Sequence, residues 1–126
     1  MKQAFVRYLA VGVLATAAHW ALLALLVETG AAPAWLGSGA GAALGAQVAF
    51  FGNRRFTFAH DGALWPAWWR FIGTAFAGAL LGMAIVAGGV ALGWHYLLAQ
   101  ALATTTVVVA TFLVNRGWTF ARRRRQ

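Results

Sequence analysis

The chain contains no cysteine and very little charge. Of its 126 residues only Glu28 and Asp61 are acidic, and only 10% carry a charge of either sign. Without cysteine, the sequence says nothing about disulfides or redox compartment. A soluble domain has about 25% charged residues. Polar side chains are too scarce here to cover a water-facing surface, so the composition favours a membrane protein.

Motifs for catalysis, metal binding and nucleotide binding are also missing. No nucleophile with an activating base is recognisable, and the two acids are expected on opposite faces of a membrane, which excludes paired-carboxylate chemistry. The histidines His19, His60 and His95 are isolated from one another and lack metal-ligand spacing. No Walker or Rossmann loop is present. We therefore expect no enzyme, no metal site and no cofactor.

Long apolar runs make up most of the chain, which is 62% hydrophobic. Each run is near the roughly 20 residues that a helix needs to span a bilayer, and helices are the only plausible form for such runs in lipid. The first run is longer than the 7–15 residues typical of a signal peptide, so we interpret it as a retained helix. The four runs cover about residues 8–27, 35–52, 71–92 and 96–114.

A nine-residue pattern occurs twice, at the end of the second and of the fourth run. Residues 50–58 and 112–120 share the pattern Phe-x-x-Asn-Arg-x-aromatic-Thr-Phe. A match of this length at equal spacing indicates internal duplication. The predicted organisation is one domain over residues 1–126, with repeat one at about 5–58, repeat two at about 68–120 and a basic tail at 121–126.

The net charge of +8 indicates orientation rather than nucleic acid binding. In a soluble protein it would suggest nucleic acid, but beside so much apolar sequence it favours topology signals and anionic lipid. All ten cationic residues lie before the first run, between the second and third, or after the fourth. By the positive-inside rule these segments are cytoplasmic. We therefore predict an all-α membrane protein whose four transmembrane helices form two parallel-repeat hairpins with both termini cytoplasmic.

Small residues recur at every fourth position in two of the runs. Spacing of this kind lets helices approach closely in lipid, although general enrichment of glycine in membrane helices produces some such patterns. The two sets are Gly37, Gly41 and Gly45, and Thr74, Gly78 and Gly82.

Polar residues inside the runs are candidates for function, because burying them in lipid is costly. His19 either lines a polar cavity or bonds to another helix as a neutral imidazole. Gln47 and Gln100 are expected to bond between helices in preference to contacting substrate. Glu28, at the outer end of the first helix, is an exposed carboxylate, a group near a polar substrate, or a partner for His95 on the same face.

The repeated motif places amide and guanidinium groups at the predicted cytoplasmic boundary. They either anchor the helices in the headgroup region or form a pair of phosphate sites, since arginine recognises phosphate with a forked geometry. The candidate phosphate-binding residues are Asn53, Arg54, Arg55, Asn115 and Arg116.

The sequence resembles the GtrA-like family over about residues 5–120. The resemblance rests on Arg7-Tyr8-x-x-Val11-Gly12-x-x-x-Thr16 and on the doubled Asn-Arg-x-aromatic-Thr-Phe motif. It implies a small multi-pass protein of the bacterial inner membrane, linked to cell-surface polysaccharide synthesis. Members are proposed to move polyprenyl-phosphate-linked sugars across the membrane. Many carry an acidic or amide residue about where His19 stands, so this position departs from the family.

For a lipid-linked sugar, the resemblance implies that Arg54, Arg55 and Arg116 hold the phosphate, that polar residues within the helices ease the sugar through, and that the tail stays in lipid. Because four helices enclose little volume, we expect a homo-oligomer or a complex with a glycosyltransferase, with the Gly37/Gly41/Gly45 face as a candidate contact. A non-transporting scaffold for a glycosyltransferase fits equally well. A small multidrug exporter fits less well, because the spans have no central acid.

Overall fold

The structure, a computed structural model, describes residues 2–57 and 62–123, apart from the side chains of residues 112 and 114–123. The regular secondary structure of the described residues is entirely helical, as predicted. They form α1 (Lys2–Glu28), α2 (Ala34–Gly52), the π-helix η1 (Asn53–Thr57), α3 (Leu64–Ala91) and α4 (Tyr96–Arg123).

The helices extend beyond the apolar runs that predicted them. α3 begins at Leu64 rather than at residue 71, and Pro66 lies in its first turn, where no backbone N–H is needed. Trp65, Trp68 and Trp69 therefore belong to a helix and not to a connecting loop. With 28 residues, α3 is about 42 Å long, against a hydrocarbon thickness of about 30 Å. Its first turns consequently suit the headgroup level, where tryptophan is enriched.

Two of the helices, α1 and α3, are long and apolar enough to cross a membrane by length and composition. Within the part of α4 whose side chains are described, Tyr96–Thr111 is apolar. α2 has 19 residues, but its glycines, Ser38 and Gln47 dilute its apolar character. The expectation that α2 also spans the membrane thus rests on its packing against the two stronger spans.

Both hairpin turns are built in the same way. Gly30 after α1 and Gly93 after α3 have left-handed backbones, with φ of 72° and 88°, which glycine adopts without steric cost. In each turn two N–H groups return to carbonyls of the preceding helix, the pattern of a Schellman cap. These bonds run from Gly30 to Val27 (3.1 Å), Ala31 to Leu26 (2.9 Å), Gly93 to Val90 (3.0 Å) and Trp94 to Gly89 (3.0 Å).

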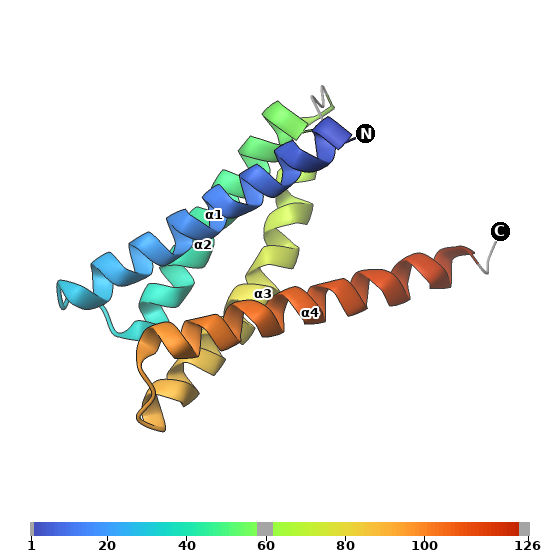
Figure 1. The fold of residues 1–126 in the computed structure, drawn as a ribbon. Coiled ribbons are helices and arrows are strands. Elements are labelled where there is room, and N and C mark those ends of the chain that lie inside the picture. The colour runs from blue at the N-terminus through green and yellow to red at the C-terminus, as the bar shows by residue number, and fades with distance from the viewer. Residues whose placement is uncertain (1, 58–61, 124–126) are drawn as a thin grey trace.

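The helices pack in the order of the chain, as an open row. Within the described residues α1 packs on α2, α2 on α3 and α3 on α4, whereas α1 and α4 make no extensive contact. In Figure 1 both hairpin turns lie at one end of the molecule, and α4 runs away from α1 toward the end marked C.

The seam between α1 and α2 is made by the first glycine set. A Cβ atom on Gly41 would lie 2.5 Å from Cδ2 of His19, and one on Gly45 would lie 2.9 Å from the carbonyl oxygen of Ala15. The prediction of close helix packing is therefore confirmed. The prediction that this glycine face is an oligomer contact is wrong, because α1 of the same chain covers it.

The second set faces α4 in part. A Cβ on Gly78 would lie 3.0 Å from Val107, and Gly82 is buried with more room around it. Thr74 is exposed and bonds back to the carbonyl of Arg70 (3.2 Å). The tightest α3–α4 approach lies nearer the turn, around the buried cluster of Val86, Ala99 and Ala103.

Candidate functional site

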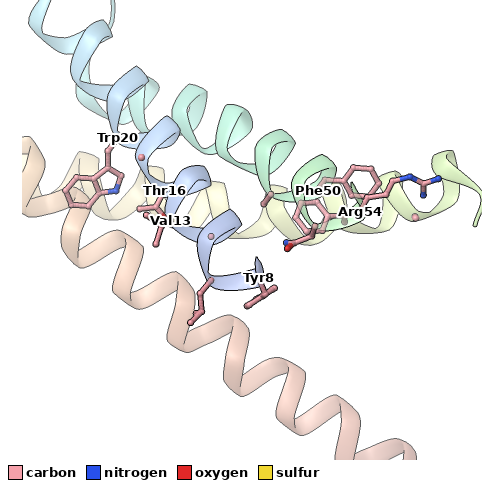
Figure 2. A pocket seen from close by; sticks show the side chains of 13 residues that line it. Tyr8, Val13, Thr16, Trp20, Phe50 and Arg54 are labelled. Carbon is pink, nitrogen blue, oxygen red and sulfur yellow. The ribbon is translucent and has the colours of Figure 1, made fainter. Parts of the chain in front are cut away.

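A large apolar groove runs along the first half of α1. Its volume is about 1190 Å³, and it is bounded by α1, the end of α2, the start of η1 and the first turns of α3. Figure 2 shows Tyr8, Val13, Thr16 and Trp20 along α1, with Phe50 and Arg54 toward one end. The remaining lining residues are Leu9, Gly12, Ala17, Ala49, Asn53, Ala67 and Phe71. A groove of this kind suits a long apolar chain.

Arg54 brings a cationic group to this groove. Its Nη2 donates to the carbonyl oxygen of Gly62 at 2.9 Å. Its Nη1 is buried and has no hydrogen-bond partner within residues 2–57 and 62–123. A buried guanidinium nitrogen without a partner is costly. Arg55, by contrast, is exposed and does not line the groove.

The first copy of the motif forms a π-helix, which the sequence analysis did not predict. Asn53 lines the groove, and its Oδ1 accepts a hydrogen bond from the Thr57 hydroxyl at 2.9 Å. Arg7 makes a longer contact, 3.4 Å, from its guanidinium to the carbonyl of Phe56. Thr57 thus holds the Asn53 amide, and α1 is tied to η1. Short π-helical segments occur frequently at functional sites.

A second, more polar hollow lies among all four helices. This cleft has a volume of about 620 Å³. Tyr8, Thr16, Ala49 and Phe71 line both the cleft and the apolar groove, so the two hollows are adjacent. The polar side chains of the cleft are Tyr8, Thr16, His19, Ser38, Thr74, Gln100, Thr104 and Thr111.

A buried hydrogen-bond chain closes the cleft on the side of the hairpin turns. The Ser38 hydroxyl donates to Oε1 of Gln100 at 2.6 Å, and Nε2 of Gln100 donates to the Thr104 hydroxyl at 3.0 Å. Ser38 and Gln100 are 2% and 1% exposed, respectively. The chain joins α2 to α4, which is the interhelical role expected of Gln100.

The other polar residues within the helices divide between the cleft and a helix interface. Gln47 accepts a hydrogen bond from Nε1 of Trp68 at 3.0 Å, joining α2 to α3, and lines neither hollow. His19 lines the cleft, and its Nε2 is buried without a hydrogen-bond partner among the described residues. The structure therefore brings His19 and Gln100 together in one cleft and leaves Gln47 outside it.

Glu28 belongs to a contact between the two hairpins. Its Oε1 accepts a hydrogen bond from the Tyr96 hydroxyl at 2.7 Å, and both residues lie at the turn end. The suggested pairing with His95 is wrong. The His95 ring stacks on Tyr96, with ring centroids 4.8 Å apart. Its Nδ1 accepts a hydrogen bond from the backbone N–H of Leu97 at 3.2 Å, so the imidazole faces the first turn of α4.

The family model for the GtrA/DPMS transmembrane domain matches residues 7–120. The chain belongs to the GtrA family. No curated protein and no solved structure matches it. GtrA proteins are membrane proteins linked to cell-surface polysaccharide synthesis, and their transmembrane domains are non-enzymatic. Among the described residues, no group of three histidine or acidic side chains is placed to hold a metal ion.

The GtrA match covers both copies of the repeated motif. Asn115 and Arg116, in the second copy, lie on α4, and their side chains are outside the described residues. Their phosphate role remains a prediction. Sequence reasoning missed Tyr8, Trp20 and Phe50 as lining residues. The arginine–tyrosine pattern near the start of the GtrA chain had pointed to Tyr8, but only as a mark of resemblance.

Proposed function

We propose that this GtrA protein moves polyprenyl-phosphate-linked sugars across the membrane. The observation that supports this most strongly is the adjacency of the two hollows. An apolar groove with Arg54 on its lining shares four lining residues with a more polar cleft. A lipid-linked sugar has three matching parts: an apolar tail, a phosphate and a hydroxyl-rich head.

Each part of such a substrate has a chemical counterpart. The Arg54 guanidinium offers a forked donor to phosphate, and Asn53 adds an amide beside it on the groove lining. Aromatic and aliphatic side chains, Trp20 and Phe50 among them, suit isoprene units. The threonine hydroxyls, His19 and Gln100 in the cleft replace the water that a sugar loses on leaving the headgroup region.

The proposed orientation follows from the charges. With both termini and the Arg54 end on the cytoplasmic side of a bacterial inner membrane, the groove lies in the cytoplasmic leaflet. The Ser38–Gln100 bond and the Glu28–Tyr96 bond then lie toward the opposite side. A homo-oligomer or a partnered glycosyltransferase is part of the proposal. Such a contact must use surfaces other than the glycine seam, which α1 occupies.

Transfer of a labelled polyprenyl-phosphate sugar between the leaflets of liposomes tests the proposal. Purified protein should accelerate transfer over empty liposomes. Arg54→Ala should slow it about 10- to 100-fold, because hydrogen bonds to a charged group contribute about 1.5–3 kcal/mol. Arg55→Ala is the matched control, since it removes the same charge from an exposed neighbour, and it should stay within about twofold of the native rate.

Two outcomes contradict the proposal in different ways. If the purified native protein, correctly inserted, gives no acceleration, the carrier function fails and a scaffold for a glycosyltransferase is favoured. If transfer occurs but Arg54→Ala and Arg55→Ala behave alike, Arg54 has no special role in holding the phosphate.

A further inference from the structure

The cleft among the four helices is more polar than the groove, yet no acidic or strongly basic side chain lines it within the part of the chain whose side chains the structure describes. Among those residues its lining contains no lysine, arginine, aspartate or glutamate. Arg54 lines the neighbouring groove and not the cleft. Residues with hydroxyl groups line the cleft from all four helices: Tyr8 and Thr16 of α1, Ser38 of α2, Thr74 of α3, and Thr104 and Thr111 of α4. The lining therefore offers hydrogen bonds without a counter-charge.

Thr104 is the best-defined donor in this lining. Its hydroxyl oxygen accepts a hydrogen bond from Nε2 of Gln100, and Gln100 is itself fixed by Ser38. With the oxygen used in this way, the Thr104 hydroxyl proton is free to be donated. The adjacent Thr105 differs, because it is exposed and donates to the carbonyl of Ala101 at 2.9 Å. The two neighbouring threonines thus have different surroundings on one helix.

We infer that the cleft selects sugars that carry hydroxyl groups and no formal charge, with Thr104 as a specificity-determining residue. This inference rests on the proposed function. A neutral sugar exchanges its hydrogen bonds to water for bonds to threonine, serine and glutamine groups. A carboxylate or an ammonium group would lose its water without meeting an opposite charge, and such a transfer is much more costly than that of a hydroxyl.

The test compares three polyprenyl-phosphate sugars that differ only at C6: glucose, glucuronic acid and 6-amino-6-deoxyglucose. Full-length protein in liposomes is assayed at pH 8, above the ordinary imidazole pKa of about 6.5, so that His19 adds no charge. The glucose lipid should be transferred at least about tenfold faster than either charged lipid, and tenfold corresponds to about 1.4 kcal/mol. Charged sugars transferred within about threefold of glucose would overturn the inference.

Equilibrium binding of the same lipids in detergent separates this inference from the proposed function. If no lipid is transferred but the glucose lipid binds at least about tenfold more tightly than both charged ones, the carrier function fails and the selectivity stands. If binding does not discriminate among the three lipids, or if none of them binds, the inference fails whatever the transfer assay shows.

Variants of Thr104 test the assignment of the residue. Thr104→Val should slow transfer of the glucose lipid about fivefold, the effect of one hydrogen bond, and Thr104→Ser should restore it. Thr105→Val is the matched control and should leave the rate unchanged. Thr104→Asp should move the preference toward the ammonium-bearing sugar. If Thr104→Val and Thr105→Val have equal effects, or if folded Thr104→Asp shows no change of preference, Thr104 does not determine the specificity of the cleft.

Discussion

Gly41 offers the sharpest test of how the first hairpin packs. In the Gly41→Ala variant the added Cβ would lie 2.5 Å from Cδ2 of His19 and even nearer to the His19 carbonyl oxygen. Carbon atoms pack favourably at about 3.5–4.0 Å, so α1 and α2 must separate locally by about 1 Å. Because the obstructing oxygen belongs to the backbone, no side-chain rotation relieves the contact. Overpacking of this kind costs about 1–3 kcal/mol of stability. We expect Gly41→Ala to lower the free energy of unfolding by about 2 kcal/mol.

The matched control is Gly12→Ala, on α1, where an added Cβ meets nothing within 4 Å. It should change stability by no more than about 1 kcal/mol, in the stabilising direction, since alanine is the better helix former. In Gly45→Ala the added Cβ would lie 2.9 Å from the Ala15 carbonyl oxygen, and in Gly37→Ala it would lie 3.1 Å from the flexible end of Leu23. The loss of stability in Gly45→Ala should therefore be smaller than in Gly41→Ala and larger than in Gly37→Ala.

Reversible unfolding in mixed detergent micelles, followed by the fluorescence of the seven tryptophans, measures these differences. The reasoning is refuted if Gly41→Ala unfolds at the same denaturant concentration as Gly12→Ala. It is also refuted if the order of the three seam glycines is reversed. Either result would mean that α1 and α2 do not meet along this face.

Three hydrogen bonds between helices give further predictions, read by the same unfolding assay. Ser38→Ala should lower the free energy of unfolding by about 1 kcal/mol. Adding Gln100→Leu should recover part of this loss, because no buried amide is then left unsatisfied. Trp68→Phe should cost about 0.6 kcal/mol, the average for bonds between membrane helices; an unchanged midpoint would contradict the α2–α3 bond. Tyr96→Phe should cost less than Ser38→Ala, since Tyr96 bonds to Glu28 in an exposed position; a larger cost would show that this contact is shielded from water.

Hydropathy and charge were sufficient to predict the helices and their order, because apolar runs in lipid leave the backbone few alternatives. They were less informative about where helices begin. The first turns of α3 contain Trp65 and Pro66, which hydropathy assigns to a connecting segment although both are compatible with a helix. The close approach at Gly41 was predicted, but not its partner, because spacing within one helix does not identify which helix faces it.

The candidate site was predicted in its chemistry and not in its grouping. Arg54 and Arg55 are adjacent in the sequence with the same charge, yet only Arg54 lines the groove. The difference depends on the direction of each side chain from η1, and nothing in the sequence announced a π-helix at Asn53–Thr57. Likewise Gln47 and Gln100 look equivalent in sequence. Only the structure shows that Gln47 bonds to Trp68 whereas Gln100 lines the cleft.

The capping of each hairpin by its own backbone has a consequence for biogenesis. The turn after α1 needs only Gly30 and carbonyls already synthesised, and the seam of that hairpin needs only α1 and α2. The first pair of helices can therefore assemble while the rest of the chain is still on the ribosome. α4 is different, because Gln100 finds its buried partner, Ser38, in the earlier hairpin. We therefore expect the amino-terminal pair to assemble first and α4 to dock later, on α3 and on Ser38 of the first pair.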